Sequence, residues 1–209
     1  MKNHLKLNKF VLITLLISFS CTIFGMQDAN DQFLRAVLDG NVAGIKQALD
    51  YGVNADATFY FQHRYRFAVP DTALRFSVGA GRTDIVKLLL EKGANVDATN
   101  EYGKTALMFA IALDRTDLIK ILLENGANIN ARDSNGDTVL MLASSYGCSS
   151  DIVKLLLERG ADINAIHHGG QTALTITTQS PTFLHSIDII DLLEEEMHQS
   201  SVSTTPVTK

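Results

Sequence analysis

The feature that most constrains this chain is a segment that occurs four times at a nearly constant interval. It reads DIVKLLLE at residues 84–91, DLIKILLE at 117–124, DIVKLLLE at 151–158 and DIIDLLEE at 188–195. A threonine precedes each copy, and successive threonines are 33, 33 and 34 residues apart, at Thr72, Thr105, Thr138 and Thr172. A period in the low thirties with two helices per unit is typical of a solenoid, whose units bury apolar surface only against their neighbours.

The sequence pattern of each unit predicts a short helix, a turn and a longer helix. In the third copy the hydroxyl of Thr105 is expected to cap a helix over residues 106–113. We expect the following turn at residues 114–115, and a second helix capped by Thr116 or Asp117 with a wide apolar face. Gly126 is the natural left-handed residue to end that helix. An extended excursion rich in Asn, Asp and Gly then leads to the next unit.

The segments that begin the short helices resemble the TPLHxA signature of ankyrin repeats. They read TALRFS at 72–77, TALMFA at 105–110, TVLMLA at 138–143 and TALTIT at 172–177. All four keep the threonine and the leucine, and all four lack the proline and the histidine. Counting back from Gly52 adds a degenerate first copy, and terminal copies of an array commonly depart from the pattern. The resemblance implies an all-α ankyrin-repeat solenoid over residues 27–196, with repeats at about 28–57, 67–98, 100–131, 133–165 and 167–196.

The resemblance further implies that a protein partner binds at the hairpin tips between repeats and on the inward side of the short helices. Any one of these surface side chains could instead be simply solvated, because few surface residues carry binding energy. The candidate partner-binding residues at these places are Glu101, Tyr102, Lys104, Arg132, Ser134, Asn135, Asp137, Tyr146, His168 and Gln171.

An insertion separates the first two repeats. Gly52 and Gly93 lie 41 residues apart, eight more than the period, and the extra length falls in TFYFQHRYRFAVP at residues 58–70. Its alternating pattern predicts an extended hairpin finger. Aromatic and arginine side chains anchor interfaces, so the finger is a candidate docking point, although its aromatics could instead cover the end of the stack. The candidate residues are Phe59, Tyr60, Phe61, His63, Arg64, Tyr65 and Arg66.

Residues 1–26 have the pattern of a secretory signal peptide. A basic start precedes an uncharged apolar run, and a small-x-small site at residues 18–20 follows it. We therefore expect a secreted or periplasmic protein. An uncleaved membrane anchor is the alternative, since a helix over residues 10–27 would reach about 27 Å, the short limit for spanning. At the other end, residues 197–209 are rich in Ser and Thr and are predicted to be disordered.

Composition and motifs argue against several other functions. The chain has 18 basic and 23 acidic residues, and a net charge of −5 does not favour nucleic-acid binding. Its two cysteines are too few for a disulfide scaffold; Cys148 is expected to be unpaired, although an exported chain could bridge it to Cys21. Adjacent His167 and His168 fit a solvated turn better than a metal site.

No nucleophile motif surrounds Cys148 or His185, and the phosphate-binding and metalloprotease motifs are absent from the sequence. We predict no enzymatic activity, no metal and no cofactor. The main hypothesis is an exported, monomeric protein-binding module. A membrane-tethered structural adaptor is the alternative, and a hydrolase with an unrecognised site is a weaker third.

Overall fold

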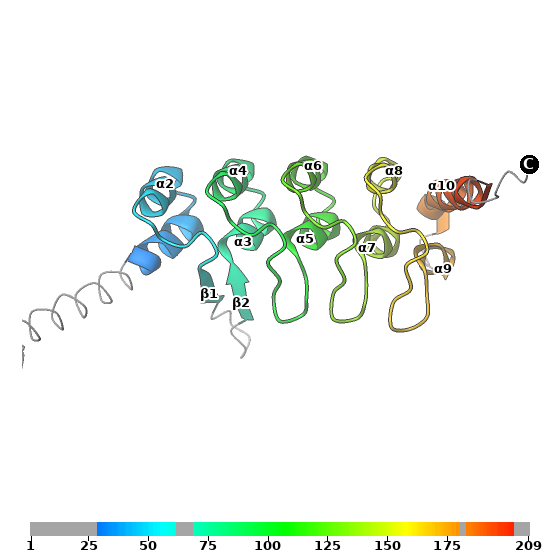
Figure 1. Ribbon diagram of the computed structural model, residues 1–209, viewed down its shortest axis with the longest axis horizontal. Helices are drawn as coiled ribbons and strands as arrows, with labels where there is room; N and C mark the ends of the chain where they lie inside the picture. Colours follow the sequence, from blue (N-terminus) through cyan, green and yellow to red (C-terminus); the bar gives the residue numbers. More distant parts are fainter. Residues whose placement is uncertain (1–28, 62–68, 180–182, 203–209) are drawn as a thin grey trace, which may run out of the picture.

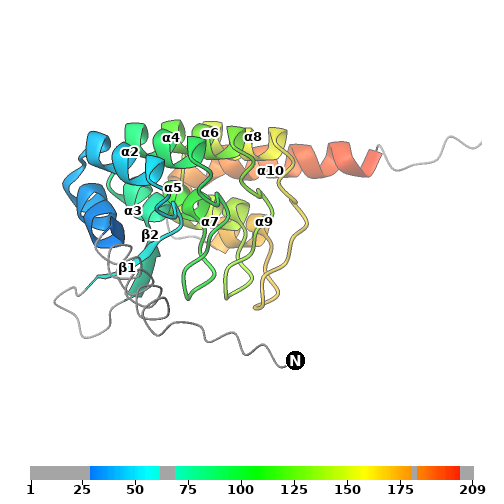
Figure 2. The same ribbon diagram turned by 60° about the vertical axis from the view of Figure 1, so that its left-hand side comes forward.

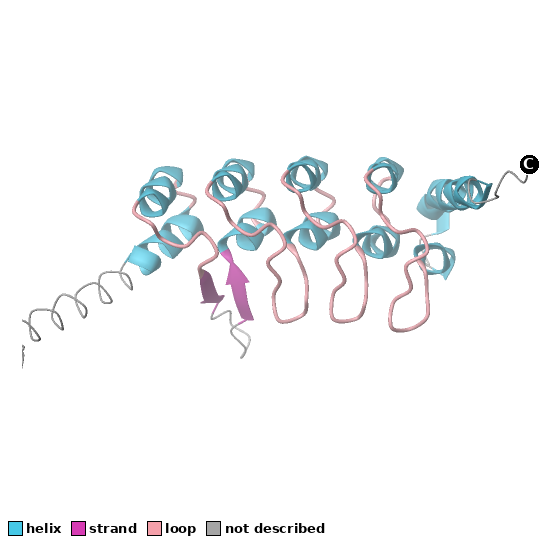
Figure 3. Cartoon of the chain, in the orientation of Figure 1, coloured by secondary structure: helices cyan, strands magenta, loops and turns pink. Residues whose placement is uncertain are grey.

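The computed structural model describes residues 29–61, 69–179 and 183–202, and within them helices stack in two parallel rows (Figures 1 and 3). One row contains the second helices of the units, α2 (Val42–Asp50), α4 (Thr83–Glu91), α6 (Thr116–Glu124) and α8 (Ser150–Glu158). The other row contains a first helix at 29–39, α3 (Ala73–Gly79), α5 (Ala106–Ala112), α7 (Val139–Tyr146) and α9 (Ala173–Gln179). The array ends in α10 (Phe183–Val202). The predicted all-α solenoid is confirmed.

Threonine hydroxyls begin the short helices, as the sequence predicts. The Thr72 Oγ1 accepts a hydrogen bond from the Arg75 backbone N–H at 3.1 Å, and Thr105 caps α5 in the same way. Thr138 caps α7 through the N–H of Met141. These threonines have extended backbone angles, so their side chains can turn back onto an otherwise unpaired helix N–H.

The predicted cap of the longer helix is wrong. The N-cap of α6 is Arg115, whose side chain makes no capping hydrogen bond, and Thr116 is already the first residue of the helix. The N-cap position falls on Arg115, whose N–H donates to the carbonyl of Ala110, and an arginine side chain has no acceptor for the N–H groups of the first helical turn. The Asp117 carboxylate instead accepts from Arg115 at 3.3 Å and from the hydroxyl of Thr83 at 3.1 Å.

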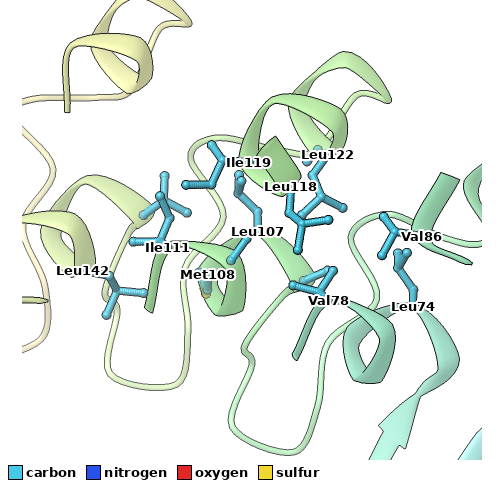
Figure 4. Packing of buried hydrophobic residues seen from close by; sticks show 14 of the residues in the cluster. Leu74, Val78, Val86, Leu107, Met108, Ile111, Leu118, Ile119, Leu122 and Leu142 are labelled. Atoms are coloured by element: carbon cyan, nitrogen blue, oxygen red, sulfur yellow. The ribbon is translucent and has the colours of Figure 1, made fainter. Parts of the chain in front are cut away.

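One continuous apolar core runs through the stack from Phe33 to Leu193. Figure 4 shows how it is built: Leu107 of α5 lies beside Leu118 of α6, and Ile111 of α5 lies on the side of Leu142 of α7. Leu107, Ile111 and Leu118 are fully buried. Neighbouring units repeat this arrangement, so each inner helix pair of the array is covered on both sides. Burial of a leucine or isoleucine side chain contributes about 1.5–3 kcal/mol, which makes stacking the main source of stability for such short helices.

Polar side chains tie the loops of successive units together. The carboxylate of Asp56 accepts the N–H of Asn95 at 2.7 Å, and one repeat further on Asp97 accepts the N–H of Asn128 at 2.8 Å. In the next pair of loops, the side-chain oxygen of Asn130 accepts the backbone N–H of Asp162 at 2.8 Å. Each of these loops begins after a left-handed glycine; Gly126, as predicted, has a φ of 83°.

The C-terminal helix differs from its predicted extent. α10 continues to Val202, so the prediction of a disordered segment beginning at residue 197 is wrong for the residues up to 202. α10 has 20 residues, against nine in each of α4, α6 and α8. It packs against both α9 and α8, and its Ile189 and Leu193 are buried in the core, whereas residues 194–198 are exposed. The rest of the predicted tail, 203–209, lies outside the described residues.

Candidate binding surface

Three hairpin loops project in the same direction from the side of the stack that carries the short helices (Figure 2). In each, the first residue donates its backbone N–H to the carbonyl four residues later, as Asp133 does to Asp137 at 3.0 Å. The side chain of that first residue also holds the tip: one carboxylate oxygen of Asp133 accepts the N–H groups of Asn135 and Asp137. Asn100 and His167 hold the neighbouring tips through equivalent bonds. The tips are therefore fixed locally.

Neighbouring tips are also bonded to each other. The N–H of Ser134 donates to the carbonyl of Tyr102, and the N–H of His168 donates to the carbonyl of Asn135, both at 3.0 Å. The guanidinium of Arg132 donates to the carbonyl of Ile166 at 2.7 Å. These bonds cross from one repeat to the next, so the three tips form a single surface. A rigid surface loses little conformational entropy when it binds a partner.

The structure brings most of the predicted hairpin residues together on this surface. Lys104, Asp137 and Gln171 are partly buried, whereas the remaining tip residues are exposed: Glu101, Tyr102, Arg132, Ser134, Asn135 and His168. Tyr102 is 54% exposed. The adjacent Glu101 carboxylate raises the pKa of Tyr102 above its ordinary value, so the phenol is a neutral hydrogen-bond donor over the physiological pH range.

Tyr146 lies apart from the tips. It is the last residue of α7, at the end next to the turn into α8, whereas the hairpin enters α7 at Val139. Eight helical residues separate these ends by about 11 Å. Tyr146 is 52% exposed and occupies the same place in its repeat as Leu113, which is 44% exposed. The two side chains therefore add exposed apolar surface at the end of the short helices that lies away from the hairpins.

The inserted segment forms an antiparallel strand pair at its base. β1 (Thr58–Phe61) pairs with β2 (Val69–Thr72), with Phe59 opposite Asp71 and Phe61 opposite Val69. This agrees with the predicted extended hairpin. The other candidate residues of the finger, His63, Arg64, Tyr65 and Arg66, lie outside the described residues.

The buried ion pair of Asp71 and Arg75, next to the finger, was not predicted from the sequence. Arg75 is only 5% exposed, its Nε lies 2.5 Å from Oδ1 of Asp71, and its guanidinium carbon lies 5.4 Å from the centroid of the Phe109 ring. The spacing of Asp71 and Arg75, four residues apart at the start of a helix, was a usable signal. The contact with Phe109 was not visible, since it depends on how two repeats stack.

Two hollows open between the last two hairpins. One, of about 350 Å³, is lined by Asn135, Asp137, His167, His168 and Gly169. The other, of about 200 Å³, lies against the short helices and is lined by Asp137, Met141, Leu142, Ser145, His167, Gln171 and Ile176. Asp137 and His167 line both hollows, which therefore adjoin. The sequence identified Asp137 as a tip residue and gave no indication of a cavity.

The imidazole of His167 forms two hydrogen bonds within its own hairpin. Its Nδ1 accepts the N–H of Gly169, so its Nε2 carries the hydrogen and donates to Oε1 of Gln171 at 3.1 Å. Neither ring nitrogen is left to bind a metal. Among the described residues, no three His, Cys, Asp or Glu side chains lie close enough together to hold a metal ion.

Cys148 is in a poor environment for nucleophilic chemistry. It is buried and unpaired, and burial, together with the nearby Asp114 carboxylate, raises the pKa of its thiol to about 11. The thiolate is the reactive form, and its population at neutral pH is therefore very small. Within the part of the chain that the structure describes, no helix is long and apolar enough to cross a membrane.

Comparison with known families matches the stacked arrangement. A model described as ankyrin repeats in three copies matches residues 33–133, and one described as ankyrin repeats in many copies matches residues 122–176. Together they cover more than half of the chain. This chain belongs to the ankyrin-repeat family.

Membership of the ankyrin-repeat family indicates a protein–protein interaction module. One similar curated protein is the mouse (Mus musculus) ankyrin repeat, SAM and basic leucine zipper domain-containing protein 1. It is 30% identical over 70 residues, which is 34% of this chain and 13% of that protein. The chain thus spans a small part of this relative, and the similarity supports the repeat architecture rather than a shared partner.

Proposed function

We propose that this ankyrin-repeat protein is exported and binds a protein partner through the surface of its hairpin tips. The observation that carries the proposal is the set of exposed side chains on three tips that are hydrogen-bonded to one another. Tyr102, Asn135 and His168 lie on this surface, and the bonds between Tyr102 and Ser134 and between Asn135 and His168 fix their backbone. The strand pair at residues 58–61 and 69–72 leads into the short helix of the second repeat, as the hairpins lead into the short helices of the later repeats. We therefore include the finger at 58–70 in the binding surface.

Binding by presentation of a fixed surface needs no catalytic group, metal or cofactor. The acidic composition favours a protein partner over nucleic acid. Export rests on the signal-like sequence of residues 1–26, and we propose a monomer that acts outside the cytoplasm.

The binding surface is tested by affinity capture with the full chain, followed by identification of captured proteins by mass spectrometry. The test variant combines Tyr102→Ala, Asn135→Ala and His168→Ala. A matched control combines Lys87→Ala, Lys120→Ala and Lys154→Ala, three exposed side chains on α4, α6 and α8. Circular dichroism melting shows whether both variants keep the fold.

Loss of the captured protein with the tip variant, and its retention by the lysine control, supports the proposal. Equal capture by both variants contradicts binding at the tips. A deletion of residues 59–68 asks separately whether the finger contributes. Capture that survives this deletion removes the finger from the binding surface.

Export is tested by the mass and location of the mature chain in its own cells. A product outside the cytoplasm that lacks about the first twenty residues supports a cleaved signal peptide. A membrane-bound product of full length supports the alternative, a tethered adaptor whose uncharged segment at residues 10–27 remains in the bilayer. Light scattering of the purified chain tests the monomer.

A further inference from the structure

The second repeat contains an arginine site that it fills with its own side chain. Asp71 lies one residue before the capping Thr72, and Arg75 lies one turn later on α3. The guanidinium of Arg75 is enclosed between the Asp71 carboxylate, at 2.5 Å, and the ring of Phe109 from the next repeat. This position in the array therefore suits a guanidinium group, held by one carboxylate and one apolar side chain.

The fourth repeat has the same carboxylate without the arginine. Asp137 lies one residue before the capping Thr138, just as Asp71 lies before Thr72. Met141 takes the place of Arg75, and Ile176 takes the place of Phe109. Asp137 is partly buried and forms no ion pair with any other described residue.

The basic side chains nearest in sequence are already hydrogen-bonded elsewhere or lie on another repeat. Arg132, on the same hairpin, donates to the carbonyl oxygens of Gly136 and Ile166. The imidazole of His167 has both nitrogens in hydrogen bonds within its own hairpin. Lys104 holds the equivalent position one repeat earlier, so the third repeat presents a cation where the fourth presents the Asp137 carboxylate.

The two replacements leave a hollow beside the carboxylate. The cavity of about 200 Å³ is bounded by Asp137, Met141 and Ile176, the counterparts of the three residues that make the ion-pair site in the second repeat. Ser145 and Gln171 add polar groups at its edge. The cavity adjoins the hollow between the hairpin tips, so a side chain from a segment lying across the tips can enter it.

We propose that this cavity binds an arginine side chain of the protein partner, with its guanidinium against the Asp137 carboxylate. The proposal rests on the proposed function, and it names one chemical group of the partner. The methylene groups of the arginine would pack against Met141 and Ile176. Arginine fits better than lysine, because its planar guanidinium forms two parallel bonds to a carboxylate and packs well on apolar side chains. The pocket would fix the register of the partner along the array.

A direct test titrates the ¹⁵N-labelled full chain with N-acetyl-arginine methylamide and follows the backbone amide resonances. N-acetyl-citrulline methylamide, which is neutral and nearly the same shape, is the matched probe. We expect the arginine probe to shift the resonances of Asp137, His167 and Gln171, and the citrulline probe to leave them unchanged. Equal shifts with both probes, or no shift with either, would overturn the proposal.

Three variants locate the site. Asp137→Asn keeps the size of the side chain and should abolish the shifts, whereas Glu158→Gln removes an exposed carboxylate from α8, away from the hairpins, and should preserve them. Met141→Arg should fill the cavity from within, as Arg75 does in the second repeat, and exclude the probe. A folded Met141→Arg chain that still binds the arginine probe contradicts the proposal. If that chain does not fold, Asp137→Asn decides the matter.

The captured partner separates this inference from the proposed function. Asp137→Asn should weaken its binding by about tenfold or more, as expected when a charge-assisted bond is lost. If the tip variant with Tyr102→Ala, Asn135→Ala and His168→Ala loses the partner but Asp137→Asn retains it fully, the binding surface stands and the arginine pocket fails. If both variants retain the partner, both proposals fail.

Discussion

The thiol of Cys148 lies 3.4 Å from the carbonyl oxygen of Ile111, on the short helix of the preceding repeat. In the second repeat, the equivalent position is occupied by an arginine, Arg82. There, Arg82 donates to the carbonyl oxygens of Val37 and Leu38 at the end of the preceding short helix. Both residues directly follow a left-handed glycine at the turn between the helices of a repeat. The fourth repeat therefore has a small, buried side chain where the second repeat has a charged, partly buried one.

Burial of Cys148 predicts a slow reaction with thiol reagents. Its pKa of about 11 lies about two units above the ordinary value, so the thiolate population at pH 8 falls about 100-fold. In a chain carrying Cys21→Ser, the rate of modification by a disulfide reagent should be about 100-fold lower in the folded chain than in guanidinium chloride. Equal rates in the two states would show that the thiol is accessible and contradict the assigned burial.

The same raised pKa predicts that the protein loses stability in alkali. Because the folded pKa of Cys148 exceeds the unfolded one, the folded state favours the protonated thiol, and this contribution is complete below about pH 9. It should be lost progressively as the pH rises from about 9 to about 11. Urea unfolding across this range measures it, and Cys148→Ala should flatten the dependence. An identical slope in that variant would assign the effect to other groups.

Asp114 occupies a backbone position that suits glycine. Its φ is 53°, the only positive φ among the described residues other than glycine, and the equivalent residues Gly81 and Gly147 have φ of 68° and 65°. Asp114→Gly should therefore raise the free energy of unfolding by about 0.5–1 kcal/mol. Asp114→Ala is the control and should not stabilise, because alanine retains the Cβ that disfavours this conformation. Chemical denaturation distinguishes the two.

The elements that could be predicted from the sequence are those set by local geometry. Thr105 caps its helix and Gly126 ends one because each acts on backbone groups within a few residues. The cap predicted at Thr116 or Asp117 failed, because the N-cap position falls on Arg115, whose side chain has no acceptor for a helix N–H. The repeat period was enough to predict the solenoid, because every unit packs against its neighbours in the same way.

The features that could not be predicted from the sequence depend on contacts between repeats. Arg75 meets Phe109, and Cys148 meets Ile111, only after two units have stacked. The cavity at Asp137 is lined by Met141 and Ile176, which stand at the positions equivalent to Arg75 and Phe109. A comparison of the copies position by position contains these differences, but the structure is needed to show that the positions face each other.

Two threonines of the third repeat provide a matched test of helix capping. Thr105 is buried and its hydroxyl accepts from the N–H of Met108, whereas Thr116 is exposed and makes no capping bond. Thr105→Ala should lower the free energy of unfolding by about 1–2 kcal/mol. Thr116→Ala should change it by less than about 0.5 kcal/mol, as for ordinary surface substitutions. Similar losses in the two variants would contradict the assigned cap.

The buried pair of Asp71 and Arg75 predicts a strong loss when one partner is removed. Arg75→Ala leaves a mostly buried carboxylate without its cation and removes the contact with Phe109, so the free energy of unfolding should fall by about 3 kcal/mol. The double variant Asp71→Asn with Arg75→Met removes both charges and keeps an apolar side chain of similar length. It should recover most of that loss, because replacing a buried pair by packed neutral groups is nearly neutral. Urea denaturation of the single and double variants measures the difference; a double variant as unstable as Arg75→Ala would show that packing around Phe109, rather than the unpaired charge, accounts for the cost.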